Sequence, residues 1–212
     1  MADVLILGAN GQIARLSENI FLSDTGDDLK LYLRRADRLR DLANDRVELI
    51  DGDATDVDKL VESMKDVQMV YANLAGNNIE DQAKAVVEAM SKAGVSRLVW
   101  ISTLGIYDEV PGKFGKWNNE TLGDYITRYA AAAKVIEGSD LDYTVIRPAW
   151  LTNKDEVDYE TTQKGEAFKG TEVSRKSIAQ IVVDIAQVPS KFSKESIGVN
   201  KPNTDGDKPS WY

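Results

Sequence analysis

Short apolar runs alternate with longer segments of helical spacing along the chain, and this alternation limits the fold more than any other feature. The apolar runs, which are predicted strands, span residues 4–7, 29–33, 47–50, 67–72, 97–101 and 143–146. The predicted helices span residues 13–21, 36–43, 56–64, 79–92, 120–137 and 174–186. Right-handed β-α-β crossovers place such strands in one parallel sheet with helices on both faces. We therefore predict a three-layer α/β fold with a doubly wound parallel sheet, forming a single domain over residues 1–212.

Two stretches interrupt this alternation, at residues 104–119 and 148–172. Loops of this length in a compact domain are usually functional or disordered. Both follow the carboxyl ends of predicted strands, where open α/β sheets bind ligands, so we expect them to form the substrate side of the domain. Residues 196–199 are predicted to add an edge strand, and residues 201–212 are predicted to be loose apart from the last two.

The chain of 212 residues contains no cysteine and no histidine. This composition excludes disulfides, metal sites built on thiolate or imidazole, cysteine nucleophiles and every mechanism that relies on a histidine base. No metal site is predicted. Any acid–base chemistry must come from Tyr, Lys, Asp or Glu side chains or from a cofactor.

Acidic residues outnumber basic ones, with 35 Asp and Glu against 26 Lys and Arg, which gives a net charge of −9. Proteins that bind nucleic acid present a basic face, so nucleic acid is not an expected partner. No apolar run approaches the roughly 20 residues of a membrane span, and the first residues lack the basic and apolar regions of a secretory leader. We expect a cytoplasmic protein that binds a small-molecule substrate, and we leave its oligomeric state open.

The turn between the first predicted strand and the first predicted helix, at residues 8–14, is rich in glycine. Gly8 permits a tight turn, Gly11 lets the backbone approach a ligand, and Ala14 lets the helix pack closely on the strand. A turn of this kind after the first strand of a β-α-β unit predicts a Rossmann-type dinucleotide site, with the diphosphate at the helix N-terminus. The alternative is a glycine-rich turn that only packs against the helix. The predicted cofactor contacts in this turn are Gly8, Asn10, Gly11, Gln12 and Ile13.

The end of the second predicted strand indicates which dinucleotide is bound. An NAD site usually has Asp or Glu about 20 residues past the glycines, where the carboxylate binds the ribose hydroxyls. This chain has Arg34 and Arg35 there, and a guanidinium can form paired hydrogen bonds with a 2′-phosphate. We therefore predict NADP, with NAD as the alternative cofactor and a solvated basic turn as the other interpretation. After the third strand, Asp53 and Ala54 are also predicted cofactor contacts, with Asp53 either accepting from the adenine amino group or serving as a polar turn residue.

Short motifs follow the strand ends in a fixed order. They are residues 8–14, 52–53, 72–76, 101–107, 141–148 and 173–175. In this order and spacing, the chain resembles the atypical short-chain dehydrogenase/reductase superfamily over most of its length. The resemblance is to the NmrA-like branch, which includes biliverdin reductase B-type flavin reductases. It implies an NAD(P)-binding Rossmann fold and adds four predicted cofactor contacts, Ala72, Asn73, Leu74 and Pro148.

The resemblance also implies positions for catalytic groups. In this superfamily a Ser or Thr after the fifth strand binds the substrate carbonyl, which points to Thr103 with Ser102 beside it. The alternative is that both hydroxyls satisfy backbone groups at the strand end. The Tyr of the superfamily's Tyr-x-x-x-Lys motif falls on Tyr125, but Tyr129 stands at the Lys position. A phenol without a nearby cation is a poor acid–base catalyst at neutral pH, so Tyr125 is a candidate proton donor that lacks its usual partner.

These features predict an NADPH-dependent oxidoreductase that transfers hydride to a small carbonyl, quinone or flavin-like acceptor, with solvent protonating the product. Tyr107, Trp117 and Trp150 lie in the two interrupting stretches and are predicted to line the acceptor pocket, unless they only pack these stretches onto the domain. The absent lysine favours an alternative, a non-catalytic NADP(H)-binding redox sensor of the NmrA-like type. Sugar-nucleotide epimerase or dehydratase chemistry is a weaker interpretation, because those enzymes use the Tyr–Lys pair and usually carry a larger C-terminal domain.

Overall fold

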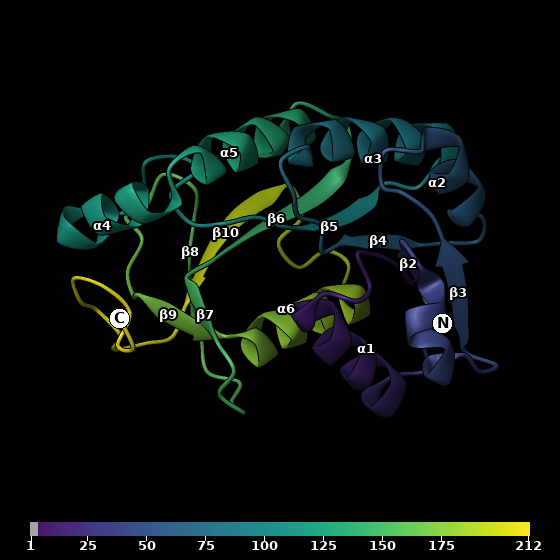
Figure 1. The fold of residues 1–212 in the computed structure, drawn as a ribbon, viewed down its shortest axis with the longest axis horizontal. Coiled ribbons are helices and arrows are strands. Elements are labelled where there is room, and N and C mark those ends of the chain that lie inside the picture. Colours follow the sequence, from purple (N-terminus) through teal and green to yellow (C-terminus); the bar gives the residue numbers. More distant parts are fainter. Residues whose placement is uncertain (1–3) are drawn as a thin grey trace.

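The computed structural model describes residues 4–212. Residues 1–3 lie outside this range, and with them the predicted start of the domain and the first residues on which the expectation of no secretory leader rests. Within it, one eight-stranded sheet crosses the molecule, and every neighbouring pair of strands is parallel except β8 with β10 (Figure 1). Its strands in spatial order are β3 (Val47–Asp51), β2 (Leu29–Leu33), β1 (Val4–Leu7), β4 (Met69–Ala72), β5 (Arg97–Ile101), β6 (Asp142–Pro148), β10 (Glu195–Asn200) and β8 (Glu160–Thr162). The order of the first six confirms the predicted doubly wound, Rossmann-type sheet.

Helices cover both faces of this sheet and give the predicted three layers (Figure 1). One face carries α1 (Gln12–Asp24), the 3-10 helix η1 (Ala36–Leu42) and α6 (Arg175–Gln187). The other face carries α2 (Val57–Ser63), α3 (Ile79–Ala93) and α5 (Asp124–Glu137). The remaining helix, α4 (Gly112–Leu122), extends beyond α5 at one end of the molecule.

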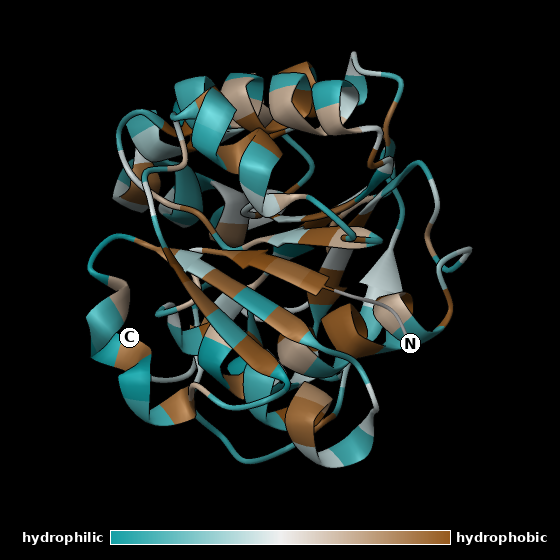
Figure 2. Ribbon diagram, turned by 90° about the vertical axis from the view of Figure 1, so that its right-hand side faces the viewer, coloured by the Kyte–Doolittle hydropathy of each residue, from teal (hydrophilic) through white to brown (hydrophobic). Residues whose placement is uncertain are grey.

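The central strands are apolar on both sides because both faces of the sheet are covered. Along β1, Val4 and Ile6 belong to the core on the side of α1 and α6, whereas Leu5 and Leu7 belong to the core on the side of α3 and α5. Figure 2 shows the hydrophobic residues of the strands lying between the two helical layers. Burying each such side chain contributes roughly 1.5–3 kcal/mol, so β1 is held firmly and its C-terminal turn has a fixed position.

The helix predicted over residues 120–137 is wrong in its first part. The chain forms two helices there, because α4 ends at Leu122 and α5 begins at Asp124. Gly123 separates them with φ 49° and ψ −127°, a backbone conformation that residues with a side chain rarely adopt. The stretch 104–119, which was predicted to be a loop, is therefore a loop only as far as Pro111.

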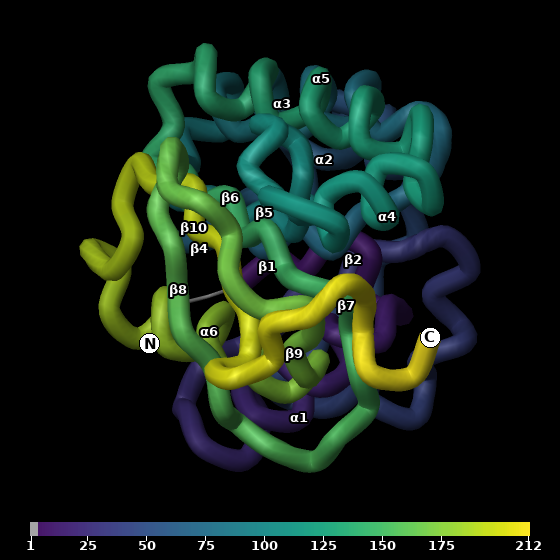
Figure 3. The backbone as a smooth tube through the Cα atoms, turned by 90° about the vertical axis from the view of Figure 1, so that its left-hand side faces the viewer, coloured from purple at the N-terminus to yellow at the C-terminus, as the bar shows by residue number. Residues whose placement is uncertain are grey.

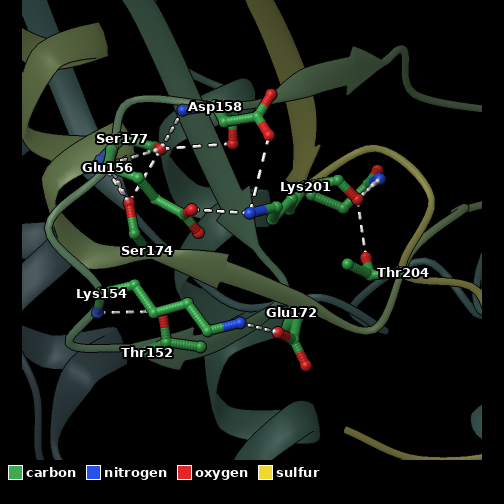
Figure 4. A network of polar contacts seen from close by, with 10 residues as sticks. Thr152, Lys154, Glu156, Asp158, Glu172, Ser174, Ser177, Lys201 and Thr204 are labelled. Carbon is green, nitrogen blue, oxygen red and sulfur yellow. Dashed lines mark hydrogen bonds and ion pairs between the residues drawn. The ribbon is translucent and has the colours of Figure 1, made fainter. Parts of the chain in front are cut away.

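The stretch 148–172 also contains more regular structure than predicted. β7 (Trp150–Thr152) pairs in parallel with β9 (Glu172–Ser174) as a second, two-stranded sheet, and β8 joins the main sheet. The strand predicted at residues 196–199 is present as β10, but its predicted place at the sheet edge is wrong, because β8 pairs with the outer side of β10. Ion pairs hold the segment between β7 and β8, and Figure 4 shows two of them, Lys154 with Glu172 at 2.8 Å and Lys201 with Glu156 at 2.6 Å.

Residues 201–212 are attached to the domain along much of their length, contrary to the prediction of a loose segment. The Lys201 N–H donates to the Glu172 carbonyl at 2.7 Å, and the Thr171 N–H donates to the Thr204 carbonyl at 3.0 Å. The Tyr212 ring packs against Trp117, with ring centroids 4.9 Å apart, which agrees with the exception that the prediction made for the last two residues. Figure 3 shows this segment crossing β7 and β9 at the end of the molecule that carries α4.

Candidate functional site

A cavity of about 480 Å³ opens where β1, β2, β3 and β4 end. The chain order reverses at this point, since β2 and β3 lie on one side of β1 and β4 and β5 lie on the other. Open α/β sheets bind ligands at such a switch point. The turns that follow these four strands line the cavity with Gly8, Asn10, Gly11, Tyr32, Leu33, Arg34, Arg38, Gly52, Asp53, Ala54, Asn73, Leu74, Ala75, Gly76, Asn78 and Gln82.

The turn after β1 has no room for a side chain at either glycine. Gly8 has a φ of 74°, and a Cβ atom there would lie 2.3 Å from the Asn73 carbonyl oxygen. A Cβ atom at Gly11 would lie 2.0 Å from Asn73 Nδ2. The Asn73 N–H donates to the Leu7 carbonyl at 2.9 Å, which fixes the end of β4 beside the end of β1. Backbone atoms of the two glycines, rather than side chains, therefore face this part of the cavity.

Helix α1 begins directly at this turn, with Gly11 as its N-cap. Among residues 4–212, no side chain caps this helix end, and the first turn contains no acidic residue. First-turn N–H groups have no partner within a helix and carry the positive end of its dipole. The close backbone approach and the uncompensated helix end together fit a diphosphate group.

Two arginines line the cavity at the end of β2, and only one of them is from the predicted pair. Arg34 and Arg38 are exposed lining residues. Arg38 Nη2 donates to the Arg34 carbonyl at 2.7 Å and Arg38 Nε donates to the Arg35 carbonyl at 3.2 Å, which places the Arg38 guanidinium beside Arg34. Arg35 has a φ of 58°, is the N-cap that precedes η1, and is not a lining residue. The guanidinium pair suited to a phosphate is therefore Arg34 with Arg38.

The turn after β3 places a carboxylate in the cavity. Asp53 Oδ1 accepts hydrogen bonds from the Thr55 hydroxyl at 2.7 Å and from the Thr55 N–H at 2.9 Å. These bonds, with a smaller contribution from the Arg34 charge, hold the pKa of Asp53 below its usual value. Tyr32 donates to the Asp53 carbonyl at 2.8 Å, and its ring fills the space that a side chain at Gly52 would need. Asp53 is thus a turn residue and also an ionised acceptor that lines the cavity.

Most of the predicted cofactor contacts line the cavity: Gly8, Asn10, Gly11, Arg34, Asp53, Ala54, Asn73 and Leu74. The others lie outside the lining, as Gln12 and Arg35 are exposed while Ile13, Ala72 and Pro148 are buried. Sequence reasoning did not name Tyr32, Asn78 and Gln82 as contacts. Gln82 Nε2 donates to the Ala75 carbonyl at 3.1 Å and to Asn78 Oδ1 at 2.8 Å, so it shapes the turn after β4. No local sequence signal marks it, because the contact joins a loop to the next helix.

The candidate carbonyl-binding residues lie at the end of β5, next to β4. The Ser102 N–H donates to the Ile146 carbonyl at 2.7 Å. Ser102 Oγ is buried and has no hydrogen-bond partner among residues 4–212, and Thr103 is 8% exposed. The Ser102 hydroxyl therefore does not satisfy a backbone group, as the alternative interpretation required. Because buried polar groups normally have a partner, this unpartnered hydroxyl is a candidate ligand contact.

Tyr125 and Tyr129 lie on α5 with stacked rings, their centroids 4.1 Å apart. Tyr129 Oη donates to the Leu74 carbonyl at 3.4 Å, so the residue at the lysine position reaches a segment that lines the cavity. Burial raises the pKa of both phenols above the usual value, and the Arg128 charge opposes this for Tyr129 without reversing it. The geometry therefore keeps both groups as neutral phenols at neutral pH.

The three aromatic residues predicted to line an acceptor pocket do not lie together. Trp117 of α4 meets Trp150 of β7, with ring centroids 4.8 Å apart. Tyr107 lies elsewhere, because its hydroxyl donates to Glu137 Oε1 at 2.7 Å and lies 3.0 Å from Ser196 Oγ. Of the three, Trp117 and Trp150 can form one aromatic surface, whereas Tyr107 anchors the loop after β5.

Residues 4–212 contain neither a membrane-spanning helix nor a metal-binding cluster of side chains. No helix in this range combines the length and the apolar character needed to cross a membrane. No group of three or more potential ligand side chains in the same range is arranged to hold a metal ion.

The chain matches the family described as NAD(P)H-binding over residues 8–189. It is similar to a Rossmann-fold NAD(P)-binding family protein from Shigella flexneri, with 39% identity and a TM-score of 0.85 over 99% of this chain and 98% of that one. A short-chain dehydrogenase/reductase from Veillonella parvula, solved in complex with NADP, has 30% identity and a TM-score of 0.92 over 99% of both chains. An uncharacterized sugar epimerase of Bacillus subtilis, YhfK, is 25% identical over 85% of this chain and 86% of its own. These matches agree with the resemblance and the dinucleotide cofactor predicted from the sequence.

Proposed function

Because the chain belongs to the NAD(P)H-binding family, we propose that it is an NADPH-dependent oxidoreductase that transfers hydride to a small carbonyl, quinone or flavin-like acceptor. The observation that carries the proposal is the cavity at the switch point of the sheet, where Gly8 and Gly11 present backbone to a ligand. A site of this shape suits an extended dinucleotide better than a compact substrate, because it spans the ends of four strands.

The lining residues divide among the parts of such a dinucleotide. Gly8, Gly11 and the first turn of α1 would hold the diphosphate, Arg34 and Arg38 a 2′-phosphate, and Asp53 the adenine amino group. When bound, the reduced cofactor supplies a hydride from its nicotinamide ring, and the protein supplies binding and orientation.

The preference for NADP over NAD rests on the end of β2, where guanidinium groups stand instead of a carboxylate. Arg34→Ala and Arg38→Ala are each expected to raise the Kd for NADP about ten- to a hundredfold, the loss expected for charged hydrogen bonds, and to leave the Kd for NAD unchanged. Arg40→Ala is the matched control, since Arg40 is an exposed arginine of η1 outside the cavity lining. Calorimetric titration gives the Kd values for NADP and NAD of the wild-type chain and of the three variants. Equal losses for both dinucleotides would contradict this role.

The neutral phenols on α5 support the proposed acceptor class. Tyr125 has Tyr129 stacked on it in place of a lysine, so the chain has no activated proton donor at this position. A conjugated acceptor such as a flavin or quinone delocalises the charge that hydride transfer creates, and solvent can then protonate it. The unpartnered hydroxyl of Ser102 is the proposed hydrogen-bond donor to an acceptor oxygen. Trp117 and Trp150, whose rings are in contact, are the proposed apolar surface for the acceptor ring.

The test measures NADPH oxidation with a panel of flavins, quinones and aldehydes. The reaction is monitored through the loss of NADPH absorbance. We expect turnover with flavins or quinones and much slower turnover with aldehydes. Ser102→Ala is expected to lower kcat while leaving the Kd for NADP unchanged, because Ser102 does not line the cofactor cavity. No turnover with any acceptor would contradict the proposal.

The second candidate is a redox sensor that binds NADP(H) without turnover, and the phenol of Tyr129 at the lysine position is the observation that favours it. This function predicts different Kd values for NADP and NADPH together with no oxidation of NADPH by any acceptor. Epimerase chemistry is not proposed, although one relative carries that name, because Tyr125 lacks the lysine partner on which that chemistry depends.

A further inference from the structure

A buried ion pair lies beneath the loop that follows β5. The Arg147 side chain is not exposed at all and that of Glu109 is 3% exposed. Arg147 Nη1 donates to Glu109 Oε1, while Arg147 Nε and Nη2 donate to the hydroxyl and the carbonyl of Ser196, both at 3.1 Å. The pair therefore joins the loop to β6 and β10, two strands that come later in the chain.

The Glu109 carboxylate also holds the loop's own backbone. Its Oε1 accepts from the Gly105 N–H and its Oε2 from the Tyr107 N–H, each at 3.0 Å. Gly105 has a φ of 89°, a conformation that favours glycine, and the Asp108 N–H donates to its carbonyl at 3.1 Å. A single buried carboxylate thus fixes two consecutive bends of the chain.

This loop begins with the residues that the proposed reaction needs. The Ser102 N–H donates to the carbonyl of Ile146, the residue that precedes Arg147, so one end of the ion pair lies beside Ser102 across the sheet. The other end, Glu109, lies seven residues after Ser102 in the chain. Tyr107 provides a second attachment through Glu137 and Ser196, and its ring lies 5.1 Å from the Arg147 guanidinium carbon. The position of Ser102 and Thr103 therefore depends on this network from two sides.

A buried ion pair of this kind is poorly explained by stability. Removing two charges from water costs about as much as their attraction returns, and apolar pairs of similar volume are often as stable or more stable. What an apolar pair cannot do is accept hydrogen bonds from the Gly105 and Tyr107 N–H groups. The geometry points to a role in setting the shape of the loop.

We propose that Glu109 and Arg147 are positioning residues for the reaction: they hold the segment that carries Ser102 and Thr103 at the reactive end of the cofactor site. This inference rests on the proposed function. Neither residue lines the cofactor cavity, so the pair acts through the loop and not on the dinucleotide.

The test compares a double variant, Glu109→Leu with Arg147→Met, with the wild-type chain. Removing both charges together avoids leaving one buried charge unpaired. The double variant still loses the hydrogen bonds from Gly105 and Tyr107, so its urea unfolding midpoint is expected to fall while the chain stays folded. The Kd for NADP is expected to stay unchanged. The kcat is expected to fall by about 10- to 100-fold, because the loop no longer holds Ser102 and Thr103 in position. A pair with a structural role alone predicts that the unfolding midpoint falls while kcat is retained.

Two further measurements make the test independent of turnover and of folding. Amide hydrogen exchange at Gly105 and Tyr107 is expected to become at least about tenfold faster in the double variant, the factor expected for loss of a charge-assisted hydrogen bond. Arg97→Met is the matched control, because Arg97 is a buried arginine at the opposite end of β5 that pairs with Asp142 of β6. It is expected to lower stability while leaving exchange at Gly105 and Tyr107, and kcat, unchanged.

The outcomes separate this inference from the proposed function. Wild-type kcat or unchanged amide exchange in the double variant would overturn the positioning role. If the wild-type chain fails to oxidise NADPH with every acceptor tested, the proposed function is overturned. The positioning role in that reaction then falls with it, whatever the amide exchange rate at Gly105.

Discussion

A buried carboxyl group on α1 is expected to make this fold less stable as the pH rises. The Glu18 side chain is not exposed, and its Oε2 accepts from Arg15 Nη1 at 2.8 Å. Its other oxygen, Oε1, is buried and has no hydrogen-bond partner among residues 4–212, and the same holds for Tyr71 Oη on β4. Burial raises the pKa of Glu18 to about 7, although Arg15 opposes the change.

The sign follows from comparing the folded and unfolded chains. Because the pKa is raised in the folded state, the folded chain binds the Glu18 proton more tightly than the unfolded chain does. The stability from this group is fully present below the ordinary pKa of 4.5 and is lost as the pH rises to about 7. The difference between these two values corresponds to roughly 3 kcal/mol. Glu18→Gln removes the titration and keeps the shape of the side chain.

Urea unfolding of the wild-type chain and of Glu18→Gln, measured at several values between about pH 5.5 and about pH 8.5, tests this reasoning. The range avoids the isoelectric point near 4.7, where the net charge is small. Relative to the variant, the wild-type chain is expected to lose about 2 kcal/mol of unfolding free energy across this range, most of it below pH 7. Glu120→Gln, at a carboxylate that is 66% exposed, should show no such trend. A difference between wild type and Glu18→Gln that does not vary with pH would refute the argument.

Three other substitutions test separate features. Gly11→Ala places a Cβ atom 2.0 Å from Asn73 Nδ2, so calorimetry should show NADP binding weakened or abolished while the thermal unfolding curve stays cooperative; unchanged affinity would contradict the close backbone approach. Tyr129→Lys restores the motif and should lower the pKa of Tyr125, seen as tyrosinate absorbance at lower pH than in wild type, and an unaltered titration would speak against the stacked geometry. Gly123→Ala should cost about 1–3 kcal/mol from backbone strain alone, because nothing lies within 4 Å of the added atom; an equally stable variant would mean that the bend between α4 and α5 relaxes freely.

The sheet and the glycine-rich turn after β1 were predictable because their causes are local in sequence. A parallel strand covered on both faces must be apolar throughout, and β1 shows this with all four residues buried. Gly8 and Gly11 were also predictable, because a position where the backbone lies this close to another segment requires glycine. For these elements, spacing and residue type carry the required information.

The remaining features depend on contacts between distant segments or on one backbone angle. The positive φ of Arg35 directs the chain into η1 and brings Arg38 to the cavity, and adjacent arginines give no sign of such a choice. The pairing of Arg147 with Glu109 joins residues 38 positions apart, so it has no local pattern. The bend at Gly123 escaped prediction because helical spacing continues on both sides of it.

The position of β10 has a consequence for how the chain becomes folded during its synthesis. β10 lies between β6 and β8, so the outer part of the sheet has a gap until residues 195–200 leave the ribosome. The strands from β1 to β5 find all their neighbours among β1 to β6, which lets the part of the sheet that lines the cavity assemble first. Arg147 meets Ser196 only when β10 arrives. We therefore expect the nascent chain to acquire the cavity at the ends of β1 to β4 before the segment at the end of β5 reaches its final shape.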